Sequence, residues 1–122
     1  MKIKVRTDGF EGYKVRALAR AKKIDRKERI EPEISITFED PIAMARILTV
    51  QRLRLLEQVR TKGASISDLA KTLKRDTSAV TKDVRKLESV KMVKVQDRVN
   101  PGHGKVKFVV AAAKEYQLTT VL

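Results

Sequence analysis

Small polar and cationic side chains recur along one side of the segment 77–90. At about 100° per residue of an α-helix, Val80, Val84 and Leu87 fall within one narrow arc, which is predicted to be buried. The opposite arc contains only polar and charged residues, namely Ser78, Thr81, Lys82, Arg85, Lys86 and Ser89. Short polar side chains near the start of a helix can approach base edges, and longer cations can reach guanine or phosphate. The pattern therefore favours a helix that enters the major groove of duplex DNA, which is wide enough to admit one.

The candidate DNA-binding residues form two groups. Those on the helix are Thr77, Ser78, Thr81, Lys82, Arg85 and Lys86. Those on the hairpin that follows are His103, Lys105 and Lys107, which are expected over the minor groove or the flanking backbone. Alternatives stay open for both groups, because the polar face could be simply solvated and His103 could be an ordinary turn residue. Lys82 and Arg85 could read guanine or pair with phosphate, and the sequence does not decide between these roles.

The elements before this segment predict a helix-turn-helix. Thr49 is the expected N-cap of a helix over residues 50–61, and Gly63 is expected just past its end. Ser67 is the expected N-cap of a second helix over residues 68–74. The residues expected to face inward from these two helices are Leu53, Leu56, Val59, Leu69, Ala70 and Leu73.

The helix 77–90, for which Asp76 is the expected N-cap, is followed by a predicted β-hairpin. Apolar and polar residues alternate over 92–99 and again over 105–110, as they do in strands. Between them, residues 100–104 form a dense turn signal of Asn, Pro, Gly and His. This hairpin, residues 92–110, is the expected wing.

The N-terminal part of the chain predicts a strand over 2–7, a helix over 10–29 and a strand over 33–38. The connection is long enough to permit parallel pairing of the two strands. Apolar residues occur at helical spacing on one side of the helix, namely Phe10, Tyr13, Ala17, Leu18, Ala21 and Ile24. The region 14–29 has eight Lys and Arg against two acids. It could be a solvated face, an arm that follows DNA phosphates, or an arm folded against a partner protein.

Two further segments lie between and after these predicted elements. Asp40-Pro41 is a strong helix start, and the apolar residues 42–48 that follow are expected to be buried on several sides. The tail, residues 111–122, is expected to form a further strand or an oligomer contact. The predicted fold class is therefore α+β: a winged helix-turn-helix domain over 40–122, with an N-terminal basic strand–helix–strand extension over 1–39. The extension is the expected dimer or partner contact.

The composition favours a polyanionic partner. The 122-residue chain has a formal net charge of +13, with a net of +7 in residues 1–30, −1 in 31–60 and +7 in 61–122. We expect nucleic acid rather than a membrane, because no apolar run approaches the length of a membrane span. The expected location is the cytoplasm, because the first residues do not resemble a secretory signal. With one His, no Cys and no recognisable carboxylate pair or phosphate loop, neither an enzyme nor a metal or cofactor site is expected.

The sequence also resembles a known group of regulators. The segments ILTVQRLRLLEQVR and SISDLAKTLKRDTSAVTKDVRKLESVKMVKV resemble the winged helix-turn-helix of MarR/ArsR-type regulators. More closely, EISITFED, LTVQRLRLL, KRDTSAVTKDVRKL and a C-terminal hydrophobic-Ala-x-x-Tyr stretch resemble small archaeal and bacterial antitoxin-like transcriptional regulators. The family pattern usually has Gly-Leu-Val at the start of the wing, where this chain has Lys91-Met92-Val93. Lys91 would then be left-handed at a cost of about 1 kcal/mol, or the helix would end differently.

Three functions are compatible with these features. The first is a sequence-specific regulator that binds double-stranded DNA as a homodimer, with contacts between subunits from residues 41–48, the N-terminal extension and the tail. The second, which the resemblance implies, is an antitoxin that neutralises a partner toxin and autoregulates its operon. The third is an RNA- or ribosome-associated winged-helix protein, which is disfavoured because aromatic residues are only 4% of the chain and RNA readers stack bases on them.

Overall fold

The computed structural model describes residues 1–30, 32–102 and 104–122, so Glu31 and His103 lie outside the described residues. Contacts divide the chain into two compact units, one of residues 47–115 and one of residues 2–46 with 116–122. The sequence predicted a division between residues 39 and 40. The contacts instead divide the chain at 46 and 47 and assign the C-terminal strand to the N-terminal unit.

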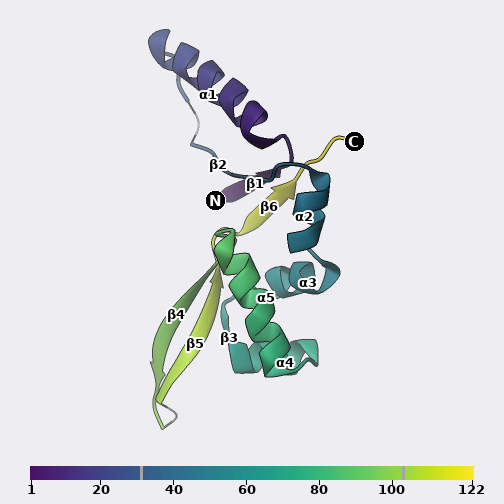
Figure 1. The fold of residues 1–122 in the computed structure, drawn as a ribbon. Helices are drawn as coiled ribbons and strands as arrows, with labels where there is room; N and C mark the ends of the chain where they lie inside the picture. The colour runs from purple at the N-terminus through teal and green to yellow at the C-terminus, as the bar shows by residue number, and fades with distance from the viewer. Residues whose placement is uncertain (31, 103) are drawn as a thin grey trace. The chain divides into compact units, whose positions relative to one another are not determined.

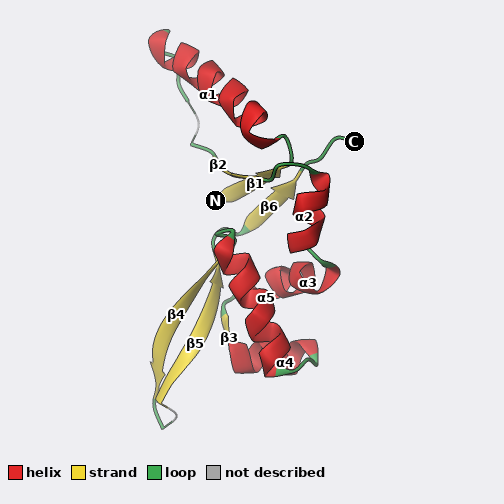
Figure 2. Ribbon diagram, viewed as in Figure 1, coloured by secondary structure: helices red, strands yellow, loops and turns green. Residues whose placement is uncertain are grey.

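The unit of residues 47–115 is a winged helix-turn-helix (Figure 1), so the predicted fold class is confirmed. Its elements are α3 (Val50–Val59), β3 (Ala64–Ser65), α4 (Ile66–Leu73), α5 (Thr77–Ser89), β4 (Val93–Asn100) and β5 (Gly104–Ala111). The three strands form an antiparallel sheet in the order β3-β5-β4. The strands β4 and β5 form a long hairpin, with Asn100 paired to Gly104 at its tip, and this hairpin is the wing (Figure 2).

The core of this unit is formed by one face of each helix together with residues at the start of the wing and in its strands. Its buried apolar residues include Leu55, Leu56, Val59, Leu69, Ala70, Val80, Val84, Leu87, Met92, Val93 and Val109. The buried face predicted for α5 is thus confirmed. The inward orientation predicted for Leu53 is wrong, because this side chain is 36% exposed and Leu55 is buried instead. At about 100° per residue, Leu55, Leu56 and Val59 lie within an arc of about 100°, and Leu53 lies outside it.

Side-chain caps fix where the helices begin. Thr49 caps α3 as predicted, since its Oγ1 accepts a hydrogen bond from the Arg52 N–H at 3.4 Å. Ser65, not Ser67, caps α4, because its Oγ accepts from the Asp68 N–H at 3.1 Å. Ser67 therefore lies inside the first turn of α4. Asp76 is at the N-cap position of α5, but its side chain makes no cap hydrogen bond.

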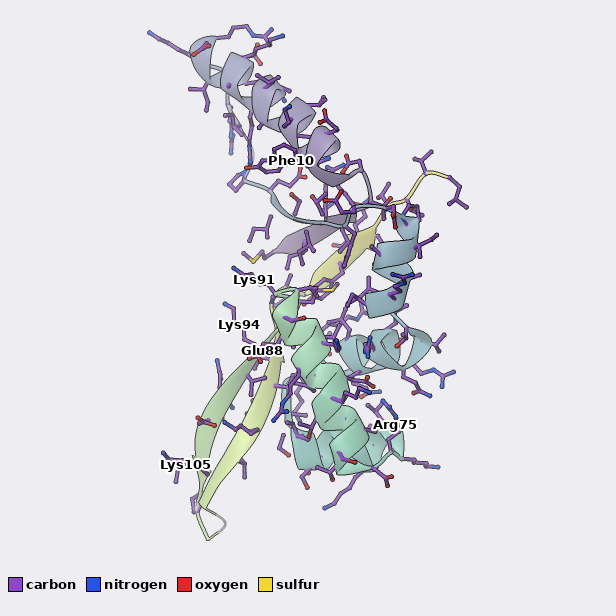
Figure 3. All side chains as sticks on the ribbon, in the orientation of Figure 1. Phe10, Arg75, Glu88, Lys91, Lys94 and Lys105 are labelled. Carbon is purple, nitrogen blue, oxygen red and sulfur yellow. The ribbon has the colours of Figure 1, made fainter. Side chains whose placement is uncertain are left out.

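A left-handed lysine ends α5. Lys91 has φ 65°, the Lys91 N–H donates to Glu88 O at 2.9 Å, and the Met92 N–H donates to Leu87 O at 3.0 Å. This pair of bonds is a Schellman motif, in which glycine is the usual left-handed residue. The left-handed alternative for Lys91, whose side chain is labelled in Figure 3, is therefore confirmed by its φ angle. Burial of Met92 after the turn compensates for the unfavourable backbone.

The substitution Lys91→Gly is expected to stabilise the fold by about 0.5–1 kcal/mol, because glycine adopts this backbone without a Cβ penalty. The midpoint of urea unfolding, followed by circular dichroism, measures the effect. Lys91→Ala is the matched control, since it removes the same charge and keeps the strained backbone. Equal midpoints for the two variants would show that charge, and not backbone strain, is responsible.

Gly63 has a different role from the one predicted. Its φ is not in the left-handed region, so it is not the C-cap glycine of α3. A Cβ at this position would lie 2.5 Å from the Phe108 ring and 2.8 Å from the carbonyl oxygen of Val109. Glycine is needed here because the chain approaches β5 closely.

We expect Gly63→Ala to destabilise the unit by about 1–2 kcal/mol, because the backbone of β5 must shift to admit the methyl group. Thermal or urea unfolding measures this loss. Lys62→Ala, at the exposed neighbouring position, is the control and should leave the midpoint nearly unchanged. An unfolding midpoint for Gly63→Ala equal to that of the parent would contradict the close approach.

The other unit contains β1 (Lys2–Arg6), α1 (Gly9–Asp25), β2 (Ile34–Thr37), α2 (Pro41–Ile47) and β6 (Glu115–Leu118). Its sheet has the order β2-β1-β6, and β1 pairs with β2 in parallel, with Ile3 opposite Ile34 and Val5 opposite Ile36. The parallel strand–helix–strand unit and the further strand in the tail are thus confirmed. The buried apolar residues of this unit include Ile3, Val5 and Phe38.

The helix α1 is shorter than predicted. It ends at Asp25 instead of residue 29, and the left-handed Lys27, with φ 57°, follows it. The Glu28 N–H donates to Lys23 O at 2.9 Å and the Lys27 N–H donates to Ile24 O at 3.0 Å, which is a second Schellman motif. Local backbone bonds therefore stop the helix before the basic run is complete.

The burial predicted for the segment 42–48 is confirmed only for Leu48, which is 7% exposed, and is wrong for residues 42–47 of the single chain. None of the residues of α2 is buried, and Ile42 is 64% exposed. Asp40 caps this helix as predicted, since its Oδ1 accepts a hydrogen bond from the Ala43 N–H at 2.8 Å. The sequence thus predicts correctly where this helix begins and that its surface is apolar. Apolar residues alone do not show that other parts of the same chain cover that surface. Among the described residues, no helix has both the length and the apolar character needed to cross a membrane.

Candidate nucleic-acid interface

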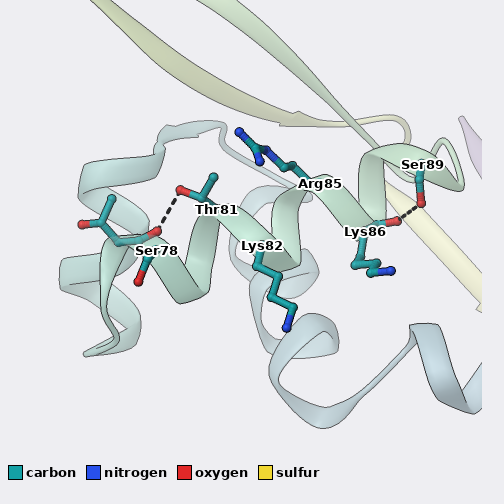
Figure 4. A pocket seen from close by; sticks show the side chains of 7 residues that line it. Ser78, Thr81, Lys82, Arg85, Lys86 and Ser89 are labelled. Atoms are coloured by element: carbon teal, nitrogen blue, oxygen red, sulfur yellow. Dashed lines mark hydrogen bonds between the residues drawn. The ribbon is translucent and has the colours of Figure 1, made fainter.

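The polar face of α5 forms a groove of about 720 Å³. Its lining consists of Thr77, Ser78, Thr81, Lys82, Arg85, Lys86 and Ser89, all from this one helix (Figure 4). Six of these side chains are exposed and Thr81 is half-buried. All six helix residues singled out in the sequence therefore lie together on one accessible surface.

The hydroxyl groups of this face are partly engaged with the helix itself. Thr81 Oγ1 donates to Thr77 O at 2.8 Å, and Ser89 Oγ donates to Lys86 O at 2.6 Å. Their oxygens keep acceptor capacity toward a ligand. In the part of the chain that the structure describes, Lys82, Arg85 and Lys86 form no salt bridge, so their charge is available to an anion.

The charges are unevenly placed across the face. At about 100° per residue, Ser78 and Arg85 lie near its centre line, Lys82 and Lys86 lie to one side, and Thr81 lies to the other. Figure 4 shows Lys82 and Lys86 extending to the same side, while Arg85 extends with Thr81 to the opposite side. Arg85 thus leaves the helix near the centre line of the polar face and extends toward the Thr81 edge, and the two lysines form the other edge.

A buried acid that the sequence analysis missed fixes the position of α5. Asp83 is only 6% exposed, and its Oδ1 accepts a hydrogen bond from Arg52 Nε of α3 at 2.9 Å. Its Oδ2 accepts a second bond from Nη1 of Arg75, in the turn before α5. Arg52 Nη1 also donates to Ile47 O at 3.1 Å. These bonds join α3, the turn and α5, and thereby hold the polar face of α5 outward.

The helical pattern contains a signal for this cluster. At about 100° per residue, Asp83 lies about 40° from Leu87 on the face predicted to be buried. A carboxylate on a buried face requires a cationic or hydrogen-bonding partner. The pattern therefore could have indicated a buried ion pair, but the partners come from outside the helix and could not be read from it.

The wing carries its charges in a different arrangement. Lys107 Nζ lies 2.7 Å from Asp97 Oδ1, its cross-strand neighbour, and this hydrogen bond holds the pKa of Asp97 below its ordinary value. Lys105 is opposite Val99 and is exposed. The Arg98 guanidinium lies 3.7 Å from the centre of the Phe108 ring, a contact that the sequence analysis did not anticipate. His103 lies outside the described residues, so its predicted role stays a prediction.

Comparisons with known proteins agree with this fold. Residues 47–114 match the model of the protein family HVO_A0114. Among solved structures, a possible transcriptional regulator from Methanosarcina mazei Go1 is 25% identical, with a TM-score of 0.51, over 60% of this chain and 63% of that one. The matched part is therefore less than two thirds of the Methanosarcina mazei chain.

Two other solved structures are similar at lower identity. The homodimeric winged helix-turn-helix DNA-binding domain of a possible ArsR-family regulator from Mycobacterium bovis is 15% identical, covering 58% of this chain and 65% of that one, with a TM-score of 0.49. A variant of ZitR from Lactococcus lactis, in complex with DNA, is 17% identical, covering 85% and 66%, also with a TM-score of 0.49. No curated protein matches the sequence. The predicted resemblance to winged-helix regulators is confirmed.

Proposed function

The chain belongs to the HVO_A0114 family, and we propose that it is a sequence-specific, double-stranded DNA-binding transcriptional regulator that acts as a homodimer. The observation that carries this proposal is the face of α5. A single exposed helix surface combines short hydroxyl side chains with three cations that have no acidic partner among the described residues. The likeness to the possible transcriptional regulator from Methanosarcina mazei supports the same class of function.

The roles of the helix residues follow from their positions. Arg85 and Ser78, near the centre line, would contact base edges, and Thr81 would approach a thymine methyl group or a base edge. Lys82 and Lys86 would pair with phosphates of one strand. Thr77 is in the first turn, where free backbone N–H groups also favour a phosphate.

The wing would contribute weaker contacts. Lys105 is exposed opposite a valine and can reach a phosphate directly. To contact a phosphate, Lys107 would either break its ion pair with Asp97 or contact the phosphate while that ion pair remains. His103 completes the proposed wing contacts. Exposed charges of this kind position the protein without reading sequence.

A homodimer would place one α5 in each of two successive major grooves. The half-sites would be about 10–10.5 base pairs apart, because that spacing presents two grooves on the same side of the duplex. The exposed apolar side chains of α2, such as Ile42, support an interface between copies. Residues 31–60 also have a net charge of only −1, so like-charge repulsion is small there.

Selection of bound sites from a random duplex pool tests the proposal. We expect a palindromic consensus for the parent protein at a fixed salt concentration. The double variant Lys82→Ala plus Arg85→Ala is the control and should enrich no consensus. A parent protein that enriches no sequence over the starting pool would contradict sequence-specific binding.

A comparison of binding to DNA and to RNA distinguishes these two possible targets. Affinities for the selected duplex and for a structured RNA, measured at equal salt, should differ by at least tenfold in favour of DNA. Tighter binding of RNA would support the RNA-associated alternative. The antitoxin alternative stays a prediction, and co-purification with the product of an adjacent toxin-like gene would test it.

The double variant Lys22→Ala plus Lys23→Ala is expected to weaken binding to all duplexes alike. If both lysines contact phosphates, the slope of log K against log salt should fall in magnitude by about 1.8. Fluorescence anisotropy over a range of salt concentrations measures the slope. An unchanged slope would show that α1 does not contact DNA.

A further inference from the structure

The helix α1 carries an uncovered stripe of apolar side chains. At about 100° per residue, its members fall within an arc of about 80° along the helix. They are Phe10, Tyr13, Ala17, Ala21 and Ile24, which we call the α1 stripe. Phe10 and Ile24 are 62% and 61% exposed, and every other member is exposed as well. Apolar residues at this spacing are the usual mark of a helix face that packs against another element.

The stripe is not turned outward by chance, because other contacts fix the rotation of α1. Its first residue, Gly9, is buried, and the Gly9 N–H donates to Phe38 O at 3.0 Å. Arg16 forms an ion pair with Asp8 and donates from Nη2 to Thr37 Oγ1 of β2 at 3.1 Å. Gly9 and Arg16 lie on a side of the helix about 90° away from the centre of the stripe. The helix is thus held to its own unit by one side, and no described residue of that unit covers the apolar side.

The stripe has local order at its N-terminal end. The rings of Phe10 and Tyr13 stack with their centres 6.3 Å apart, and Lys14 Nζ lies 5.6 Å from the centre of the Phe10 ring. Aromatic side chains that are already ordered lose little conformational freedom on binding. Phe10 and Tyr13 therefore form a suitable anchor for a partner.

The charge around the stripe indicates what kind of partner would cover it. Lys14 borders one edge of the stripe and Arg20 borders the other. Residues 9–29 contain eight Lys and Arg against three Asp and Glu, a net charge of +5. Pairing with the same helix of a second copy would bring two such segments together, which is unfavourable. A partner surface that has an apolar seam with acidic residues on both sides would be attracted by Lys14 and by Arg20.

We propose that the α1 stripe is the docking surface for an acidic amphipathic helix of another protein. The partner would place apolar side chains, spaced as i, i+3, i+4 and i+7, along the stripe, and Asp or Glu beside Lys14 and Arg20. This surface is separate from Lys22 and Lys23, which lie on other sides of α1 and are assigned to DNA. The inference does not depend on DNA binding by α5.

Two synthetic peptides of about three heptads each test the proposal with the full chain. Both have leucine at the seam positions, and one has Glu and the other Lys at the remaining positions. We expect the Glu peptide to bind with a Kd in the micromolar range and the Lys peptide to bind at least tenfold more weakly. The variant Phe10→Gln plus Ile24→Gln should lose at least tenfold in affinity for the Glu peptide. The variant Lys22→Ala plus Lys23→Ala is the control and should lose less than threefold.

Other occupants of the stripe would give different results. Equal binding of both peptides, or no binding of the Glu peptide, would overturn the proposal. A mass in light scattering that falls from dimer to monomer on Phe10→Gln plus Ile24→Gln would identify a second copy as the occupant and would also overturn it. Binding to vesicles with phosphatidylglycerol but not to the Glu peptide would identify a membrane instead. Affinity for the selected duplex should be unchanged in this variant, so failure here is distinct from failure of the DNA proposal.

Discussion

Asp83→Asn is expected to lower the free energy of unfolding by about 2–4 kcal/mol. The carboxylate accepts hydrogen bonds from Arg52 and Arg75, and all three side chains are largely covered. Asparagine removes the negative charge and leaves two guanidinium groups close together without compensation. Since a domain of this size is stable by only about 5–15 kcal/mol, the loss is a large part of the total. The midpoint of urea unfolding measures it.

Asp76→Asn is the matched control for this substitution. Asp76 is an exposed acid at the start of the same helix, and its side chain makes no cap hydrogen bond. Its replacement should change stability by less than about 0.5 kcal/mol. Equal shifts in the unfolding midpoint for the two variants would show that Asp83 has no special role.

A combined variant separates the charge of this cluster from its packing. Arg52→Met, Arg75→Met and Asp83→Leu together replace the ionic cluster with apolar side chains of similar size. Such replacements are often neutral or stabilising, whereas removal of one partner is costly. We therefore expect the triple variant to recover most of the stability that Asp83→Asn loses. If it does not, Asp83 stabilises the unit by some interaction other than charge compensation.

Periodic patterns predicted most of the fold correctly because they depend on residues close together in the chain. The buried face of α5 follows from three apolar residues at helical spacing. The wing follows from two alternating segments and a turn between them. Some errors are local, such as the cap of α4 and the end of α1. Others occur where distant segments decide the outcome. Leu53 is a plausible inward residue of α3 until the position of β5 and α5 fixes which face is buried, and Gly63 resembles a C-cap until Phe108 approaches it.

The candidate site shows the same division. All the helix residues chosen from the sequence lie on the polar face of α5, because a single helix carries them. The Arg52–Asp83–Arg75 cluster was missed because its members come from two helices and a turn. The pairing of Lys107 with Asp97 depends on strand register, which alternation alone does not fix. The polar face of one helix was predictable, and side-chain contacts between elements were not.

Arg85→Ala is expected to lower affinity for the selected duplex by about 10- to 100-fold, because a bidentate contact to guanine contributes about 1–3 kcal/mol of discrimination. Affinity for unrelated duplexes should fall only by the loss of one positive charge. The ratio of specific to non-specific affinity should therefore fall by at least about tenfold. Competition binding at one salt concentration, with the selected and a scrambled duplex, measures this ratio.

Lys86→Ala is the control, since it removes the same charge from the flank of the same helix. It should weaken binding to both duplexes equally and reduce the salt slope by about 0.9, as expected for a phosphate contact. The contrast depends on the position of Arg85 near the centre line of the polar face of α5. Figure 4 shows that Lys86 extends to the opposite side of the helix from Arg85. If the two variants lower specific and non-specific affinity in the same proportion, Arg85 contacts only phosphate, and the sequence must be read by Ser78, Thr81 or the wing.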